Sequence, residues 1–497
     1  MLHGRLALPF TASASALMPA DARAQESLGE QGLSPTTSMA SAIEKLRQLK
    51  MSDDVVLTRP PVQPDALRGV ELHTPGQPPS AHIRPGGDRR RVFMLLQGAC
   101  SPFFLHLAKK LKQDGHEVIK VNFNSGDSFY WRHDKAYAYR GKLEDLGDWI
   151  AELWRKHHVT DQVLFGDRRP VHRDAVLKAE YLGIRTHVFE EGYFRPYWVT
   201  LEREGVNGHS LLPRDPDWFR EAGRHLEDAP TPQSFQAPFS ERARHDITYH
   251  LAGATNPLLF PRYRPHSIHA VQEYAGYATR LPLMRWYKRR DAKRIDQLMG
   301  SGAPYYMLPL QLNTDAQIRH HSRFANMQEV IQRVMKSFAL NAPRGARLVI
   351  KNHPLDMGLV DYPGLIRSLE RRYDLIGRIV YLESGNLEKL LQQAKGMITV
   401  NSTTGNVALQ YRCPTFCMGD PIFNLPGLTF QGSLHDFWTQ GQRPDTTLFR
   451  HFRNTVIHTV QLNGGFYSKP GMQLAVIGAT KRLCAERSPL EQMMSRC

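Results

Sequence analysis

Hydrophobic residues recur along much of the chain as short runs that alternate with stretches of helical periodicity. Apolar runs at residues 92–96, 116–123, 163–165 and 186–189 predict buried strands. Between them, helical spacing of apolar residues at 101–114, 143–154 and 172–182 predicts covering helices. Strands that alternate with helices through short loops indicate a parallel sheet with both faces covered. This part of the chain therefore predicts an α/β domain.

A second series of the same kind starts at residue 305. Strands are predicted at 305–310, 347–351, 379–382, 397–400 and 414–417, and helices at 327–340, 362–372 and 387–394. Residues 195–300 lose this rhythm and hold helical patterns at 240–252 and 270–299. The pattern favours two Rossmann-like α/β domains with a cleft between them. We predict a flexible arm at 1–88, domains at 89–265 and 301–445, a helical connector at 266–300 and C-terminal helices at 446–497.

Composition separates the first 88 residues from the rest of the chain. Residues 26–88 are rich in Pro, Ser and Gly, which is typical of a flexible arm. Residues 1–25 imitate a signal peptide only weakly, because Pro9 interrupts a poorly apolar centre. The five cysteines form an odd, scattered set, so we expect reduced thiols and a cytosolic protein. No apolar run approaches the length of a membrane-spanning helix.

The formal charge of +16 favours an anionic partner. Basic clusters occur at residues 89–91 and 288–290, and no aromatic RNA-binding signature accompanies them. A membrane surface or an anionic substrate is therefore a better expectation than nucleic acid. The basic segment 286–294 is either a face that lies against phosphate or a solvated helix face.

Polar residues gather where three strands of the second domain are predicted to end, which is where ligands bind in such sheets. After the strand at 305–310 come Gln311, Asp315 and Gln317. One carboxylate among amides suits stabilising or attacking an electron-poor carbon. A turn that caps the next helix explains Asp315 equally well.

The other two strand ends carry groups that suit a phosphate. His353 follows the predicted strand that ends at Lys351, and Pro354 comes directly after it. Its side chain can donate to a phosphate, or it can simply be a hydrogen-bonded residue at the strand boundary. The third strand end opens a helix, where hydroxyls and backbone amides favour an anion. Its residues are Asn401, Ser402, Thr403 and Thr404.

The first domain offers charged strand ends. Gln97 and Gly98 break the first strand, and such a loop leaves backbone N–H groups for a ligand, although any α/β domain needs tight turns there. Glu190 and Glu191 end a later strand and lie on opposite faces if that strand continues, so only one need face a crevice. A solvated turn boundary is the alternative. The remaining charged residues at these strand ends are Asp167, Arg168, Arg169 and Arg195.

Six segments, taken in order, resemble the capsule polysaccharide biosynthesis and export proteins of the KpsS/LipB type. They are LLQGACSPFFLHLAKKLKQDGHEVIKVNFNSGD, VLFGDRRPVHRDA, HVFEEGYFRPYWVTLE, QLNTDAQIRHHS, KNHPLD and NSTTGNVAL. The resemblance runs from Arg91 to Gly419 and leaves the arm outside. It implies a retaining β-Kdo transferase of GT-B-like architecture on the cytoplasmic face of the inner membrane. The implied reaction moves Kdo from CMP-β-Kdo to a lyso-phosphatidylglycerol-type lipid, which starts the linker of a capsular polysaccharide.

The same resemblance assigns roles to individual residues. Gln311 to Asp315 matches a Gln-x-x-x-Asp motif of related β-Kdo transferases, and His353-Pro354 matches a His-Pro motif. Asp315 is then the expected nucleophile, and Glu191 or Glu190 the acid/base group that retention also requires. Donor binding is expected from Gln311, Gln317, Lys351, His353, Pro354, Asn401, Ser402, Thr403 and Thr404. Acceptor binding is expected from Gln97, Gly98, Asn124, Asp167, Arg168 and Arg195.

No cofactor or metal is expected, since Arg168, Arg169, Arg195 and Lys351 can hold the anionic groups and no Asp-x-Asp motif lies at these strand ends. The implied partners are CMP-Kdo, an anionic lipid acceptor, the membrane surface, a second Kdo transferase and the capsule export machinery. Two other functions remain open: a GT-B-like sugar-nucleotide epimerase, and a non-catalytic component of capsule export that binds lipid-linked polysaccharide.

Overall fold

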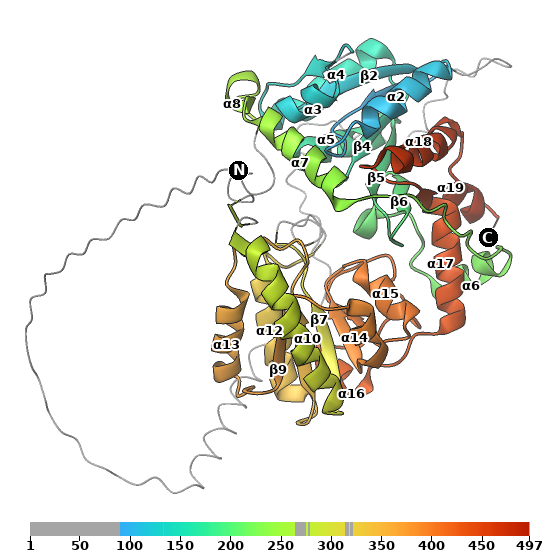
Figure 1. Cartoon of the computed structure of the whole chain (residues 1–497). Helices are drawn as coiled ribbons and strands as arrows, with labels where there is room; N and C mark the ends of the chain where they lie inside the picture. The colour runs from blue at the N-terminus through green and yellow to red at the C-terminus, as the bar shows by residue number, and fades with distance from the viewer. Residues whose placement is uncertain are drawn as a thin grey trace, which may run out of the picture. The chain divides into compact units, whose positions relative to one another are not determined.

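A computed structural model describes residues 90–132, 134–263, 275–276, 279–313, 318 and 322–496 (Figure 1). All of them belong to one compact unit, Leu72–Cys497. The predicted arm at 1–88 lies outside the described residues, and so do Asp315 and Gln317.

The first sheet has seven strands in the order β12-β6-β5-β4-β1-β2-β3. Its strands are β1 (Val92–Leu95), β2 (Glu117–Asn122), β3 (Tyr137–Ala138), β4 (Asp161–Phe165), β5 (Arg185–Glu191), β6 (Trp198–Arg203) and β12 (Gln461–Asn463). β1 to β5 pair in parallel, as the sequence predicts. β6 and β12 add two antiparallel pairs at one edge of the sheet, which the sequence pattern did not predict. The chain turns back directly after β5, and so short a connection permits only antiparallel pairing.

Helices cover both faces of this sheet (Figure 1). The helices of this domain are α2 (Phe103–Gln113), α3 (Ser125–Tyr130), α4 (Leu146–His157), α5 (Pro170–Leu182), α6 (Pro216–Arg224), α7 (Phe239–Gly253) and α8 (Asn256–Leu259), with the 3-10 helices η2 (Leu143–Asp145) and η3 (Asn207–His209). Strand side chains alternate between the faces. Phe189 of β5 packs in the same core as Leu107 of α2, whereas Val188 packs in the other core with Ile150 of α4.

The second sheet has five parallel strands in the order β11-β10-β7-β8-β9. They are β7 (Tyr305–Pro309), β8 (Arg347–Lys351), β9 (Ile379–Leu382), β10 (Gly396–Thr399) and β11 (Thr415–Cys417). The accompanying helices are η4 (Leu281–Leu283), α10 (Met284–Gly300), α12 (Met327–Asn341), α13 (Tyr362–Arg372), α14 (Leu387–Gln393), α15 (Thr404–Gln410) and α16 (Leu434–Gln440). Strands β9-β8-β7-β10-β11 repeat the order β3-β2-β1-β4-β5 of the first sheet. The prediction of two Rossmann-like domains is thereby confirmed.

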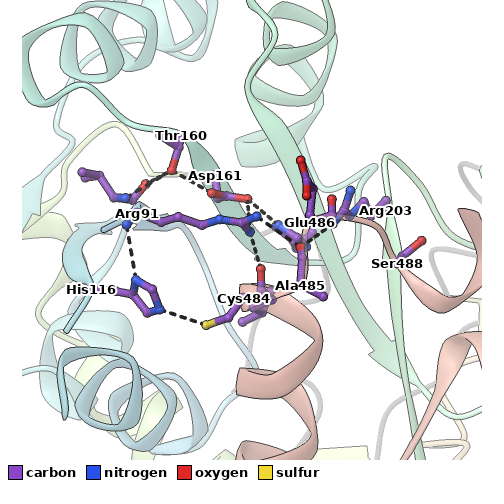
Figure 2. A network of polar contacts seen from close by, with 12 residues as sticks. Arg91, His116, Thr160, Asp161, Arg203, Cys484, Ala485, Glu486 and Ser488 are labelled. Atoms are coloured by element: carbon purple, nitrogen blue, oxygen red, sulfur yellow. Dashed lines mark hydrogen bonds and ion pairs between the residues drawn. The ribbon is translucent and has the colours of Figure 1, made fainter. Parts of the chain in front are cut away.

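The C-terminal segment returns to the first domain. It consists of α17 (Thr446–Val460), β12, α18 (Lys469–Cys484) and α19 (Pro489–Met494). Figure 2 shows how two arginines, Arg91 directly before β1 and Arg203 at the end of β6, hold the end of α18. Arg91 donates to the carbonyl oxygens of Leu483 at 2.6 Å and Ala485 at 3.2 Å, and Arg203 donates to those of Ala485 and Glu486, each at 3.0 Å. The predicted C-terminal helices are therefore an integral part of the first domain.

None of the helices in the described part of the chain is both long enough and apolar enough to cross a membrane.

Candidate active site

A pocket of about 850 Å³ lies between the two domains, at the carboxyl ends of strands from both sheets. Strands β4 and β5 lead into it from the first sheet, and β7, β8 and β10 from the second. This is the edge at which α/β sheets bind ligands. The cleft predicted from the sequence is thus present.

The first domain and the C-terminal helix α17 supply every charged residue in the described lining. These residues are Asp167, Arg168, Arg169, Glu190, Glu191, Arg195, Arg242 and Arg453. Five are arginines and three are carboxylates, so the lining has a surplus of two positive charges. We call this set the charged wall. A surplus of guanidinium groups in a partly enclosed space favours an anionic ligand.

Glu190 and Glu191 end β5 inside the strand, so their side chains leave opposite faces of the sheet, as predicted. Both nevertheless line the pocket. Glu191 follows the face that packs against α2, and its Oε1 lies 3.5 Å from a guanidinium nitrogen of Arg242 on α7. Glu190 follows the opposite face, and its Oε1 accepts a hydrogen bond of 3.0 Å from the backbone N–H of Glu191.

Protein contacts hold the arginines of the charged wall in place. Arg169 donates to the side-chain oxygen of Gln97 and to the carbonyl of Gly98, each at 3.2 Å, and its guanidinium lies 4.8 Å from the Phe165 ring centre. Arg195 donates to the carbonyl of Gly192 at 3.3 Å. Arginines held in this way lose less conformational freedom when they bind an anion.

The second domain contributes only uncharged residues to the described lining. They are Leu310, Gln311, Leu312, His353, Leu355, Asn401, Ser402, Thr403, Thr404, Asn406, Val407 and Gln410. We call this set the neutral wall. It places amide, hydroxyl and imidazole groups opposite the charged wall.

Gln311 and Asn401 are joined at the point where the strand order of the second sheet reverses. Gln311 follows β7 and Asn401 follows β10, the neighbouring strand. The Gln311 amide donates to Asn401 Oδ1 at 3.1 Å, and the backbone N–H of Asn401 donates to Gln311 Oε1 at 3.3 Å. Nearby, Thr404 Oγ1 is buried and has no hydrogen-bond partner among the described residues. It is therefore available to a ligand.

His353 is a neutral hydrogen-bond donor at physiological pH. Burial, followed by the charge of Lys351, lowers its pKa from 6.5 to about 4. The backbone N–H of Leu355 donates to its Nδ1 at 3.1 Å, so the ring proton is on Nε2. Asn352 fixes the same loop, because its side-chain oxygen accepts from the backbone N–H of His353 at 2.8 Å.

Five residues that the sequence assigned to the site are absent from the described lining: Gln97, Gly98, Asn124, Lys351 and Pro354. Lys351 is only 6% exposed, and burial lowers its pKa. Gln97 and Asn124 are buried in a polar network of the first domain. Gln97 donates to Asp127 at 3.2 Å and Asn124 donates to the Tyr249 hydroxyl at 2.7 Å, so both amides are engaged within the first domain.

The sequence interpretation missed Arg242, Arg453 and Asn406. Asn406 joins the domains, because its amide donates to the buried carbonyl of Tyr193 at 3.0 Å. Arg242 and Arg453 come from helices far along the chain from β4 and β5. No local pattern marks them, since their place in the pocket depends on how these helices pack.

Within the described ranges, no three His, Cys, Asp or Glu side chains are grouped so that they could hold a metal ion.

The family model for the capsule polysaccharide biosynthesis protein matches residues 160–467. The chain belongs to this family. It is 38% identical over 381 residues to the capsule polysaccharide export protein KpsS of Escherichia coli, a match that covers 76% of this chain and 97% of KpsS. It is 34% identical over 391 residues to the capsule polysaccharide modification protein LipB of Neisseria meningitidis serogroup B, covering 76% of this chain and 91% of LipB. The family resemblance inferred from the sequence is therefore confirmed.

A solved structure, the beta Kdo 2,7 transferase of Thermosulfurimonas dismutans KpsC, is 14% identical to this family member with a TM-score of 0.36. That match covers 79% of this chain and 99% of the KpsC chain.

Proposed function

We propose that this capsule polysaccharide biosynthesis protein is a glycosyltransferase that moves Kdo from CMP-β-Kdo to a lyso-phosphatidylglycerol-type lipid, with retention. The observation that carries the proposal is the pocket in which Gln311, His353 and Asn401 lie opposite Glu190 and Glu191. Family membership supports it as well, since the relatives are named for capsule polysaccharide export and modification.

The two walls suit the two kinds of group in the donor. CMP-Kdo has a phosphate and a carboxylate, which the arginines of the charged wall can bind as ion pairs. The amides and hydroxyls of the neutral wall suit the cytidine and sugar hydroxyls, which need oriented hydrogen bonds without a charge. His353 contributes an Nε2–H donor that is not positively charged. We expect no metal to be needed for such a donor, because the arginines of the charged wall can balance its negative charges.

In the proposed reaction, a carboxylate oxygen of Asp315 bonds to the anomeric carbon while the bond to the CMP phosphate oxygen breaks. CMP leaves with the electron pair. The acceptor hydroxyl then attacks the same carbon, gives its proton to Glu191, and displaces the Asp315 carboxylate. Two inversions give net retention. We assign the proton to Glu191 because it lies beside Arg242, whose charge can hold the phosphate of the acceptor lipid.

The test is transfer from CMP-Kdo, generated in situ, to a fluorescent lyso-phosphatidylglycerol analogue, followed by mass spectrometry of the product. We expect one Kdo to be added by the wild type, and neither Asp315→Asn nor His353→Ala to support the reaction at a comparable rate. Release of free sugar without acceptor would instead favour a sugar-nucleotide epimerase. Capsule assembly that survives both substitutions in cells would favour a non-catalytic export component.

The proposed acceptor also implies a location and partners. A lipid of the inner membrane would bring the protein to the cytoplasmic face of that membrane. A second Kdo transferase that extends the linker, and the capsule export machinery, would then act on the product.

A further inference from the structure

Helix α7 presents its polar residues to the protein. Arg242 lies 3.5 Å from Glu191, and the Tyr249 hydroxyl donates to Asp127 at 2.9 Å. His245 falls between them on the same face, since positions three or four apart align on a helix. A helix that only covers a domain has apolar residues on this face. In α7 the usual orientation is reversed.

The opposite face of α7 carries exposed apolar side chains. Ile247 is 43% exposed and Leu251, one turn further on, is 69% exposed. Arg244 precedes them on the same face, and Leu258 of α8 is 83% exposed. We call Arg244, Ile247, Leu251 and Leu258 the outer stripe. Large apolar side chains exposed on neighbouring helices in sequence favour a surface that is covered in use.

The charges around the outer stripe favour an anionic cover. The most exposed residues of α7 and α8 include no acidic one, and the partly exposed Asp246 of α7 lies 3.8 Å from Arg242 on the inner face of the helix. The guanidinium of Arg140 lies 5.8 Å from the ring centre of Phe260, the residue directly after α8, and Arg262 is exposed beside it. An apolar stripe edged by cations is the composition of a helix that lies in the interface of an anionic bilayer.

We propose that α7 and α8 dock the protein on an anionic lipid surface through the outer stripe. Ile247, Leu251 and Leu258 would enter the region below the headgroups, and Arg244 would bind lipid phosphate. The inner face of the same helix brings Arg242 to the pocket. Docking of this kind lets a lipid acceptor keep its acyl chain in the bilayer while its headgroup reaches Glu191. The inference therefore rests on the proposed function, which supplies the lipid acceptor.

Flotation of the full-length chain with vesicles tests the docking without any need for catalysis. The vesicles are phosphatidylethanolamine with about one third phosphatidylglycerol, and phosphatidylcholine alone. We expect the wild type to float with the anionic vesicles only. The double variant Ile247→Gln/Leu251→Gln should lose at least about tenfold in partitioning, since two partly buried aliphatic side chains no longer enter the interface.

A matched control removes two exposed leucines elsewhere. Leu177 and Leu182 of α5 are 43% and 49% exposed. Leu177→Gln/Leu182→Gln should float like the wild type. Arg244→Glu should weaken flotation with anionic vesicles and make the remainder less sensitive to salt. All variants change exposed side chains, and equal thermal unfolding midpoints would show that each is folded.

Equal flotation of the α7 variant and the wild type would overturn the proposal, and so would equal binding to neutral vesicles. Self-association of the wild type that the α7 variant loses, measured by light scattering, would assign the stripe to a second copy instead. Transfer to a short-chain, water-soluble acceptor separates this inference from the proposed function. The α7 variant should keep that activity, whereas absence of transfer in every protein would refute the transferase and leave the flotation result standing.

Discussion

The two domains repeat one strand order, yet they bring different chemistry to the pocket between them. In each sheet the strand order reverses beside the first strand, between β1 and β4 and between β7 and β10. The first domain, with α17, supplies arginines and carboxylates, and the second supplies amides, hydroxyls and a neutral imidazole in the described lining. The same topology therefore provides only the location of a site. Its chemistry depends on the few residues that follow each strand and on the helices that reach the pocket.

Under the proposed function, the charged wall transfers the proton and binds anions, and the neutral wall orients the donor. Substitutions in the two walls should then fail in different ways.

The largest effect is expected from the acid/base carboxylate. If Glu191 is the base, as proposed, Glu191→Gln should lower kcat by about a hundredfold or more, because the acceptor hydroxyl then has no group to take its proton. Glu190→Gln is the matched control on the opposite face of β5. Its kcat should fall less than tenfold, which corresponds to an increase of roughly 1 kcal/mol in the activation free energy. The two kcat values are measured as rates of Kdo transfer to the lipid analogue. A greater loss in Glu190→Gln would exchange the two assignments.

Anion binding should give the next largest effect. Arg195→Gln should raise KM for CMP-Kdo by about thirtyfold, since a hydrogen bond to a charged group contributes roughly 2 kcal/mol. Ser402→Ala in the neutral wall should raise it only about threefold. Initial rates at several salt concentrations would check this, and the Arg195→Gln enzyme should depend less on salt than the wild type. Equal effects of the two substitutions would remove the distinction between the walls.

The Gln311–Asn401 pair connects the neutral wall to the stability of its domain. Gln311→Leu removes both hydrogen bonds between Gln311 and Asn401 inside a buried site, which should cost roughly 1.5 kcal/mol of the free energy of unfolding. The thermal unfolding midpoint should fall by about 2 to 4 °C. Asn313→Ala, which removes a partly buried amide nearby, provides a comparison for the size of the decrease. An unchanged midpoint would show that the pair contributes nothing to the fold.

The smallest effect concerns His353 and pH. The pKa of His353 is about 4 in the folded protein and 6.5 in the unfolded chain. As the pH falls, the unfolded chain therefore takes up the proton first. The free energy of unfolding therefore falls as the pH drops below 6.5, because only the unfolded chain gains from protonation. Between pH 7 and 5.5 this contribution is roughly 1 kcal/mol. His353→Gln should lack this part of the pH dependence. If the free energies of unfolding of the two proteins changed equally with pH across this range, the conclusion that the imidazole is neutral in the folded protein would be contradicted.

The sequence predicts the two α/β domains because apolar runs and helical spacing are local properties. It misses β6 and β12 for a physical reason. β12 has only three residues, and pairing with β6 rather than its own pattern makes it a strand. Distant partners also hold Gln97 and Asn124, two residues expected to bind the acceptor, outside the described pocket lining. The side-chain amide of Gln97 donates to Asp127, and that of Asn124 donates to the hydroxyl of Tyr249.

The site itself is partly predictable for the same reason. Strand ends are local, and parallel strands bring them to one edge, so His353, Asn401 and Glu191 meet as expected. Arg242 is not predictable from periodicity. An amphipathic pattern places the apolar face of a helix inward, whereas α7 turns Ile247 and Leu251 outward and Arg242 toward the pocket.

The central claim is that this pocket performs transfer with retention through a covalent intermediate on Asp315. Glu191→Gln, with its second step slowed, should accumulate that intermediate when it is mixed with CMP-Kdo. Intact-protein mass spectrometry should then show the mass of one added Kdo residue, and peptide mapping should assign it to the peptide that contains Asp315. The double variant with Asp315→Asn should show no addition. Transfer that proceeds with no adduct, or an adduct on another residue, would contradict the account.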